Sequence, residues 1–227
     1  MVNESTGIYS VAEAARLSNA SAREIRRWLY GYSFPSKKLA STTKVLASPL
    51  WTTQIGEASA IGFRDLMELR FVKHFVSQGV SLQLVRSALQ SARSMFQHDY
   101  PFTARKFLTD GKRIFHDAID ETEKALTDVA SKQVVIDPVI RPSLYAGIEY
   151  AKSGLATKWY PVPKSKIIVL DPQRSFGAPV IEDYGVPTFT LAAAYKVEKS
   201  ASSVALQYRV PRAAVIAASK FEDKLPA

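Results

Sequence analysis

Two short amphipathic segments, each opened by the pattern Ser-x-x-Glu, follow one another near the start of the chain. The pattern occurs at Ser10/Glu13 and again at Ser21/Glu24. In such a pattern the serine side chain accepts from the amide three residues later, while the glutamate bonds back to the serine amide, so each pattern marks a helix start. We predict helices over 11–17 and 22–30, separated by a tight turn. Gly31 should end the second helix in a left-handed conformation.

The two faces of the second predicted helix differ sharply in chemistry. Its apolar face would pack on the first helix through Ala22, Ile25 and Leu29. The opposite face repeats basic and aromatic side chains at i, i+3, i+4 and i+7: Arg23, Arg26, Arg27 and Tyr30. A helix-turn-helix with an arginine stripe on its second helix is typical of proteins that place this helix in the major groove of DNA. A merely solvated face is the alternative.

A segment rich in Ser, Thr and Pro follows this pair of helices. We predict two strands in it, Val45/Leu46 and Trp51–Ile55, which would form a small wing. Its lysines would contact phosphates and add affinity rather than sequence preference: Lys37, Lys38 and Lys44. A plain surface loop is nearly as consistent with the composition.

Two longer helical patterns come next. The first repeats apolar residues from Phe63 to Phe75 and stops at Gln78–Gly79. The second restarts at Ser81 and carries a narrow apolar seam at alternating spacings of three and four: Leu82, Val85, Leu89, Ala92 and Phe96. This seam could be ordinary core or a dimerisation surface, and the pattern favours neither.

The middle of the chain predicts less regular structure. The stretch "YPFTARKFLTDGKRIF" suggests two short strands around Asp110–Gly111, because this dipeptide is typical of tight hairpins. A charge-mixed helix is expected over 117–132, and the Pro- and Lys-rich stretch over 157–166 indicates a linker.

The C-terminal segment combines a hairpin with helices. Ile167–Leu170 predicts a buried strand, and the Pro and Gly residues of "DPQRSFGAPVI" turn the chain into a second strand. Helices are expected over 188–196, 202–207 and 211–221, and the last two form a second pair like a helix-turn-helix. The predicted fold class is therefore mainly α with small β-hairpins (α+β).

The formal charge of +9 is concentrated in the first half of the chain. Residues 1–62 hold 7 basic and 4 acidic side chains, and residues 63–116 hold 9 and 4. The remainder is close to neutral, with 7 and 7 over 117–166 and 7 and 6 over 167–227. A basic half beside a neutral half favours binding of a polyanion, although a generic basic surface is the alternative.

Other features exclude several classes of protein. The chain has no cysteine, so disulfides, thiolate metal sites and cysteine nucleophiles are absent. No apolar run approaches the roughly 18 residues of a membrane span, and the first residues do not resemble a signal peptide, so we expect a cytoplasmic protein. The histidines His74, His98 and His116 lie far apart, without metal-ligand spacing.

No catalytic site emerges either. No nucleophile elbow surrounds Ser175, and no glycine-rich phosphate loop precedes a predicted helix. The acidic residues Asp117, Asp120, Glu121 and Glu123 fit the solvated face of a charge-mixed helix. We therefore expect neither enzymatic activity nor a metal or cofactor.

The N-terminal sequence resembles a known family. The segments "YSVAEAARLSNASAREIRRWL" and "FRDLMELRFVKHFVSQGVSLQLVRSAL", within residues 8–92, are similar to the winged helix-turn-helix domain of MerR-type regulators. The resemblance implies that the second helix enters the major groove, that a wing contacts the backbone, and that a later long helix pairs two protomers. The groove contacts would fall to Arg23, Arg26, Arg27 and Tyr30, and the wing contacts to Lys37, Lys38 or Lys44. The missing cysteines exclude a thiol-based metal sensor.

The C-terminal sequence resembles a narrower family. The pattern "DP-x-x-S-F-G-x-P-V-I", followed by "VALQY-x-V-P-x-A-A-V", is similar to a small bacterial domain of unknown function found in antitoxins of PIN-type nuclease toxins. The order of segments along the whole chain resembles one branch of VapB-type antitoxins. This resemblance implies a homodimeric antitoxin that neutralises a PIN-type ribonuclease and represses its own operon by binding double-stranded operator DNA. Contacts to the toxin, or a second set to DNA, would fall to Arg174, Arg209 and Arg212.

These readings divide the chain into three parts. Residues 1–98 would form the DNA-binding domain with its dimerisation-type helix, 99–166 a connecting α+β segment, and 167–227 the antitoxin module. The competing hypothesis is a ligand-responsive MerR-type transcriptional regulator. Its apolar pocket could be lined by four aromatic residues: Trp159, Tyr160, Phe176 and Tyr184.

Overall fold

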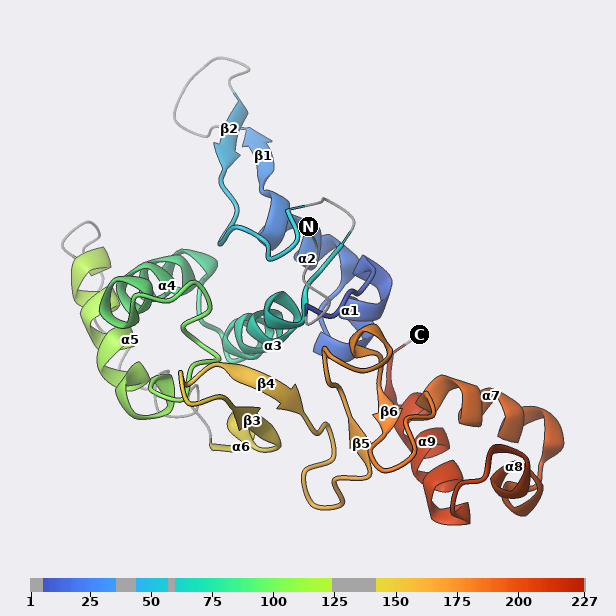
Figure 1. The fold of residues 1–227 in the computed structure, drawn as a ribbon. Coiled ribbons are helices and arrows are strands. Elements are labelled where there is room, and N and C mark those ends of the chain that lie inside the picture. The colour runs from blue at the N-terminus through green and yellow to red at the C-terminus, as the bar shows by residue number, and fades with distance from the viewer. Residues whose placement is uncertain (1–5, 36–43, 57–59, 124–141, 227) are drawn as a thin grey trace.

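The computed structural model describes residues 6–35, 44–56, 60–123 and 142–226. Its N-terminal part consists of α1 (Val11–Ser18), α2 (Ala22–Tyr30) and a hairpin of β1 (Tyr32–Pro35) and β2 (Lys44–Ala47). The hairpin projects away from the rest of the molecule beyond the end of α2 (Figure 1). The helix-turn-helix and a wing-like hairpin therefore stand together, as the sequence predicts.

Both predicted capping boxes are present. The Ser10 hydroxyl accepts from the Glu13 amide, and the Ser21 hydroxyl accepts from the Glu24 amide, each at 3.2 Å. Gly31 has the predicted positive φ of 76°, but its ψ of 179° lies outside the left-handed helical region. A Cβ at this position would collide with the carbonyl oxygen of Ala47 on β2. The glycine therefore allows the wing to begin directly at the end of α2.

Of the two predicted wing strands, Val45/Leu46 lies within β2, whereas the strand predicted over Trp51–Ile55 is wrong. β2 pairs with β1 in an antiparallel register that sets Tyr32 opposite Ala47, and 51–55 form no strand. Trp51 is buried, and its indole N–H donates to the Asp65 carboxylate at 2.8 Å. Burial of this large ring with its polar atom satisfied fixes the segment against α3 instead of in a sheet. Lys37 and Lys38 lie outside the described residues.

Two long helices follow, α3 (Phe63–Ser77) and α4 (Leu82–Phe96), close to their predicted bounds. Along the apolar seam of α4, Val85, Leu89 and Ala92 are buried within the chain. The next helix, α5 (Phe107–Glu123), lies alongside α4 (Figure 1). Of the two interpretations of this seam, the structure therefore shows core.

The hairpin predicted around Asp110–Gly111 is wrong, because α5 runs through this dipeptide. The buried positions of α5 recur at helical spacing: Phe107, Gly111, Ile114, Phe115 and Ala118. Packing of this stripe outweighs the local preference of Asp-Gly for a turn. The helix predicted over 117–132 is present as far as Glu123, and its remainder lies outside the described residues.

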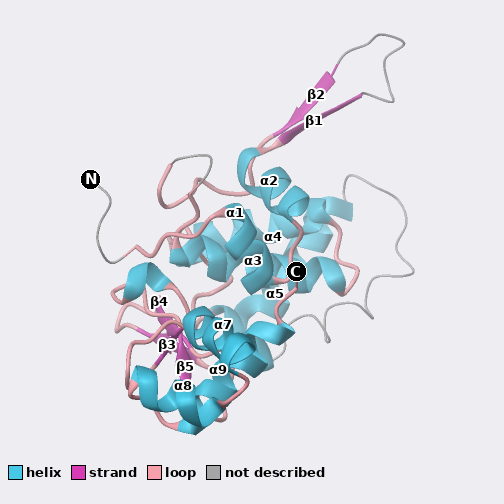
Figure 2. Ribbon diagram, turned by 90° about the vertical axis from the view of Figure 1, so that its right-hand side faces the viewer, coloured by secondary structure: helices cyan, strands magenta, loops and turns pink. Residues whose placement is uncertain are grey.

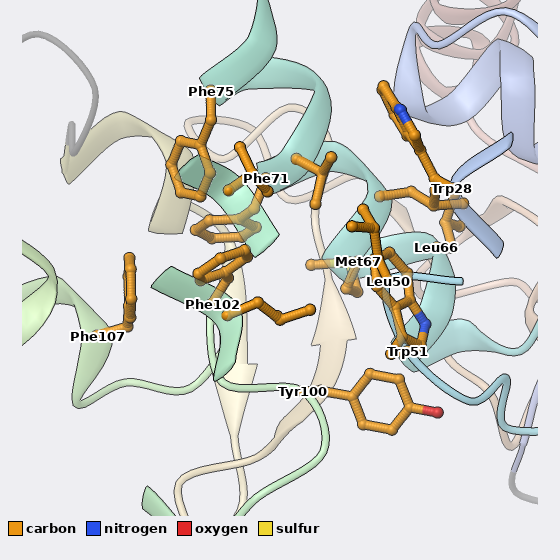
Figure 3. Close-up of a cluster of buried hydrophobic side chains, with 14 of the residues drawn as sticks. Trp28, Leu50, Trp51, Leu66, Met67, Phe71, Phe75, Tyr100, Phe102 and Phe107 are labelled. Atoms are coloured by element: carbon orange, nitrogen blue, oxygen red, sulfur yellow. The ribbon is translucent and has the colours of Figure 1, made fainter. Parts of the chain in front are cut away.

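An aromatic cluster joins α3, α5 and the segment between α4 and α5 (Figure 3). The ring of Phe75 meets Phe102 edge-on at a centroid distance of 5.0 Å and Phe115 at 5.2 Å. Phe107 meets Phe102 at 4.9 Å. These rings are almost fully buried, and edge-to-face pairs add to the free energy gained by burial alone. The cluster is the rigid base on which α3 carries the helix-turn-helix.

The prediction of a linker over 157–166 is also wrong for its first residues, which belong to a strand. After the short α6 (Pro142–Tyr145), β3 (Ile148–Tyr150) and β4 (Ala156–Trp159) form an antiparallel hairpin. The ring of Trp159 is buried and lies 3.7 Å below the Arg70 guanidinium of α3. Trp159 thus makes a long-range contact with Arg70, although the Pro and Lys content of this segment is typical of a linker.

The C-terminal part closely follows its prediction. β5 (Ile168–Val169) and β6 (Val180–Ile181) form the hairpin, with a 3-10 turn over Ser175–Gly177 between them. Three helices complete the chain: α7 (Thr188–Glu198), α8 (Ala201–Tyr208) and α9 (Arg212–Lys224). They pack on one another around a small core, with Val204 and Val215 fully buried.

The predicted fold class, mainly α with small antiparallel hairpins, is confirmed (Figure 2). Helices dominate the described part of the chain, and its strands are two to four residues long. Within that part, no helix is both long and apolar enough to cross a bilayer. The division of the chain at residues 98 and 166 stays a prediction.

Candidate nucleic-acid interface

The outer face of α2 presents two of the four predicted groove contacts. Arg23 and Arg26 are exposed, one helical turn apart. Arg27 is half-buried, because its guanidinium lies over the ring of Tyr32 at 4.0 Å. Tyr30 is half-buried and packs against the core, with its hydroxyl oxygen buried. The structure therefore places two arginines where DNA could reach them and uses a third to join α2 to the wing.

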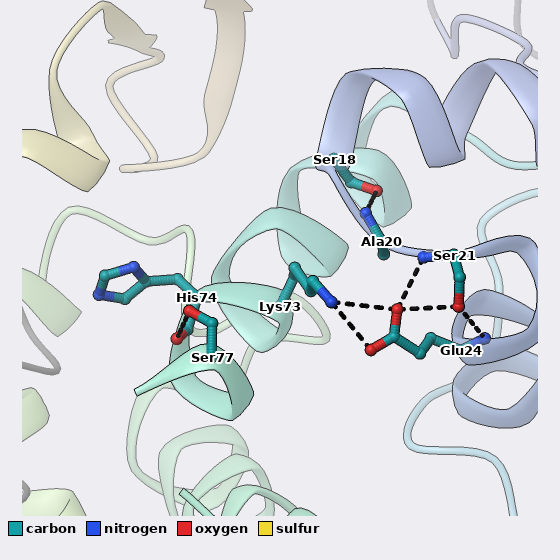
Figure 4. Close-up of polar contacts among 7 residues, drawn as sticks. All are labelled: Ser18, Ala20, Ser21, Glu24, Lys73, His74 and Ser77. Carbon is teal, nitrogen blue, oxygen red and sulfur yellow. Dashed lines mark hydrogen bonds and ion pairs between the residues drawn. The ribbon is translucent and has the colours of Figure 1, made fainter. Parts of the chain in front are cut away.

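The opposite face of α2 is anchored in the core. Ile25, Trp28 and Leu29 are buried, and Trp28 lies beside Leu66 of α3 in Figure 3. The ammonium of Lys73 on α3 lies 2.9 Å from the Glu24 carboxylate (Figure 4). Burial alone would raise the pKa of Glu24, but the bonds from Ser21 and Lys73 outweigh it and hold the pKa below its usual value. α2 is thus anchored to α3 by buried side chains and an ion pair.

Two arginines of α4, not anticipated from the sequence, fix the exit of the wing. Arg86 donates to the backbone carbonyls of Ser48 at 2.8 Å and Pro49 at 3.1 Å. Arg93 donates to the carbonyl of Leu50 at 3.3 Å. Their spacing of seven residues places them on the same face of α4. The backbone carbonyls that they bind cannot be predicted from a sequence pattern. These bonds hold the segment that follows β2 as the chain leaves the wing.

The wing contains one of the predicted phosphate contacts and an exposed apolar side chain. β2 starts at Lys44, directly opposite Pro35 of β1. Leu46 on the same strand is 75% exposed. Contact of Lys44 with phosphate, and of the α2 residues with bases, stays a prediction.

The three arginines predicted for the C-terminal module have different roles in the structure. Arg174 is half-buried and pairs with Glu182 at 3.4 Å, and it also donates to the Glu182 carbonyl at 2.6 Å. It therefore ties the β5–β6 connection together. Arg209 and Arg212 are exposed, at the end of α8 and the start of α9. The structure thus leaves only these two arginines well placed for a partner.

The two helix-turn-helix units of the chain share one turn geometry. In each, an eight-residue helix is followed by a left-handed residue, a buried apolar residue and the residue that caps the next helix. These residues are Asn19 (φ 59°), Ala20 and Ser21 in the N-terminal unit, and Arg209 (φ 53°), Val210 and Pro211 in the C-terminal unit. The C-terminal helix pair is therefore a second helix-turn-helix in backbone geometry.

The outward faces of the two second helices differ in chemistry. At the second, fifth and sixth positions, α2 carries Arg23, Arg26 and Arg27, whereas α9 carries Ala213, Ile216 and Ala217. A groove-reading helix gains most of its affinity and specificity from cationic and polar side chains at such positions. The N-terminal unit has them, and the C-terminal unit has small or apolar residues instead.

The aromatic residues suggested for a ligand pocket do not come together. Trp159 and Tyr160 are buried, whereas Phe176 is 77% exposed and Tyr184 is 47% exposed. Phe176 lines a groove of about 420 Å³, whose lining includes none of the other three. Among the described residues, no group of His, Asp and Glu is arranged to hold a metal ion.

Comparisons with known proteins agree with this geometry. Residues 7–89 match the model of a family described as "Putative DNA-binding HTH domain". The crystal structure of Rv2018 from Mycobacterium tuberculosis shares the fold, with a TM-score of 0.65 over 92% of this chain and 96% of that one, at 18% sequence identity. A search of the curated proteins found no match. The N-terminal part of this chain is thus similar to the "Putative DNA-binding HTH domain" family, and it has the corresponding pair of helices.

Proposed function

We propose that this chain is the antitoxin of a type II toxin–antitoxin pair, acting in the cytoplasm, and that it represses its own operon. The observation that carries the DNA-binding half of the proposal is the exposed Arg23/Arg26 pair on an anchored α2 beside a wing. Two arginines on such a helix can each donate two hydrogen bonds to a guanine. The proposal assigns no catalytic step to the chain.

Binding to the DNA upstream of its own gene tests this half. We expect Arg23→Ala/Arg26→Ala to weaken binding to this duplex by roughly 10- to 1,000-fold, and to flatten the salt dependence. The matched control is Lys152→Ala/Lys164→Ala, which removes the same charge from exposed sites near the β3–β4 hairpin and should change affinity only slightly. Equal binding of upstream and scrambled duplexes by the wild type would contradict autoregulation.

The second half of the proposal is capture of a PIN-type ribonuclease by the C-terminal module. Its support is the surface of α8 and α9, where small and apolar residues are bordered by Arg209, Arg212 and Lys220. The stretch from Lys199 to Phe221 contains no Asp or Glu. Such a surface suits a protein whose exposed carboxylates surround its active site, because protein interfaces combine apolar centres with arginine-rich borders.

Co-expression with the nuclease encoded beside this gene tests the second half. The wild-type chain should form a stable complex that suppresses ribonuclease activity. Arg209→Glu/Arg212→Glu should weaken the complex by at least about tenfold, whereas Lys152→Glu/Lys164→Glu should not. Loss of binding to upstream DNA, rather than to the nuclease, in the Arg209/Arg212 variant would instead assign α9 to DNA.

A further inference from the structure

An apolar groove lies where the start of α1 meets the C-terminal module. It has a volume of about 420 Å³, and its walls come from 8–17, 175–179, Phe189 and 222–225. Three large apolar side chains at this groove remain open to solvent: Ile8 at 44%, Phe176 at 77% and Phe189 at 59% exposure. A cluster of this kind is unusual on a monomeric surface and marks an interaction site.

The apolar surface continues along α7. Phe189, Ala193 and Val197 recur every four residues and are exposed, with Val197 at 80%. The other face of the helix is buried through Leu191 and Ala192. α7 lies at the outer edge of the C-terminal module (Figure 1), so its stripe is accessible to another molecule.

The backbone around Phe176 holds this ring outward. Ser175 and Phe176 have φ values of 47° and 54°, a left-handed conformation that costs free energy for residues other than glycine. The turn is held from the N-terminal side, where the Ile8 amide donates to the Phe176 carbonyl at 2.9 Å and the Tyr9 hydroxyl donates to the Gly177 carbonyl at 2.6 Å. The turn is thus fixed by its backbone bonds to the N-terminal segment, while the Phe176 ring itself stays outside the core of its own chain.

We propose that a second copy of this chain covers this surface, in a two-fold symmetric dimer. A protruding ring and a groove within one patch are self-complementary, because a two-fold axis places each Phe176 at the groove of the other copy. The apolar seam of α4, the other candidate for self-association, is buried within the chain.

Charge also favours a second copy at this surface. The whole chain carries +9, so two copies repel across most of their surfaces. The charged residues that line the groove are Glu13, Arg16 and Glu222, and Arg16 pairs with Glu222 at 3.2 Å. The patch therefore carries no excess of positive charge.

Only the biological role of this dimer rests on the proposed function. A dimer would present two helix-turn-helix units per particle, as recognition of an operator with two half-sites requires. The surface itself is argued from exposure, backbone geometry and charge, so dimerisation and DNA binding can be measured separately.

Sedimentation equilibrium of the full chain without DNA tests the proposal. The test variant is Phe176→Asn/Phe189→Asp, because Asn tolerates the left-handed backbone and Asp is favourable in the first turn of a helix. The control is Leu206→Asp, which removes another large side chain, 83% exposed, from α8 of the same module. Circular dichroism and thermal unfolding show whether each variant keeps the fold, and the single variant Phe176→Asn replaces the double variant if the latter does not.

We expect a wild-type dimer whose dissociation constant rises by at least about tenfold in the test variant and stays within about twofold in the control. A wild-type monomer at the highest soluble concentration would overturn the inference, and so would a dimer that the test variant leaves unchanged. A monomer that still binds its upstream DNA would leave the proposed function standing. A dimer that shows no preference for that DNA would support the dimer interface and contradict the proposed autoregulation.

Discussion

Glu68 illustrates at the scale of one residue how the domain is held together. Its carboxyl group has no exposed surface and accepts from the amides of Phe102 at 3.0 Å and Thr103 at 3.1 Å. Burial raises its pKa to about 7, although these bonds act in the opposite direction. The Thr103 hydroxyl also contacts both this carboxyl group and the Tyr100 carbonyl, and it has a single proton to donate. A protonated Glu68 satisfies both contacts, since it can donate to Thr103 while Thr103 donates to Tyr100.

This geometry predicts a pH-dependent stability. Between the ordinary pKa of about 4.5 and the folded value of about 7, the unfolded chain releases the Glu68 proton while the folded chain keeps it. The contribution of Glu68 to stability is therefore complete below pH 4.5 and is lost as the pH rises to about 7, by an amount on the order of 3 kcal/mol. Urea unfolding at pH 5 and pH 8 measures it, and Glu68→Gln should lose this part of the pH dependence. The same pH dependence in both proteins would contradict the assignment.

At the scale of elements, the wing depends on the junction between α2 and β1. Gly31 combines a positive φ with close approach of the Ala47 carbonyl, so no other residue fits without movement. Arg27 of α2 lies over Tyr32 of β1, and Arg86 holds the strand exit through the Ser48 carbonyl. The wing is thus positioned by contacts at its base.

Substitution of Gly31 should loosen the wing without unfolding the domain. Gly31→Ala introduces both a strained φ and a collision with β2, which together cost about 1–3 kcal/mol. We expect amide exchange in β1 and β2 to accelerate by roughly tenfold or more, with several-fold weaker DNA binding. Ser33→Ala, an exposed position on β1, is the control and should leave both quantities unchanged. Unaltered exchange in Gly31→Ala would show that β1 and β2 can absorb the collision.

At the scale of the whole molecule, the N-terminal domain and the C-terminal module are joined by specific polar contacts. The buried Tyr9 hydroxyl donates to the Gly177 carbonyl, and burial raises the pKa of this tyrosine far above its usual value. Arg16 of α1 reaches Glu222 of α9, more than 200 residues away. The segment leading into the DNA-binding helices is therefore held by the opposite end of the chain.

Loss of the Tyr9 hydroxyl tests this connection. Tyr9→Phe keeps the ring but leaves the buried Gly177 carbonyl unsatisfied, so we expect a loss of about 1–2 kcal/mol in the free energy of unfolding. Tyr184→Phe removes a hydroxyl from a residue that is 47% exposed and should cost little. Equal stability of the two variants in urea would contradict a structural role for the Tyr9 bond.

The elements that the sequence predicted correctly are those whose signals are local. The capping serines Ser10 and Ser21, the apolar repeat of α3 and the helix pair around Pro211 each act within a few residues of chain. The arginines of α2 could be placed on one helix face for the same reason, since helical spacing alone sets their direction. The contact of Arg27 with Tyr32 could not be predicted, because it depends on where the wing begins.

Only the tertiary structure decided the elements whose partners are distant in the chain. Asp110–Gly111 lies in a helix because α5 buries its stripe against α4 and the phenylalanine cluster, and Trp51 leaves the wing because Asp65 receives its indole N–H. The sequence by itself thus determined a basic helix-turn-helix, a mainly α fold and a second pair of helices at the C-terminal end. Long-range packing determined the strands of the wing, the fate of the α4 seam and the groove beside Phe176, because the free energy of burying a side chain depends on neighbours that no local pattern contains.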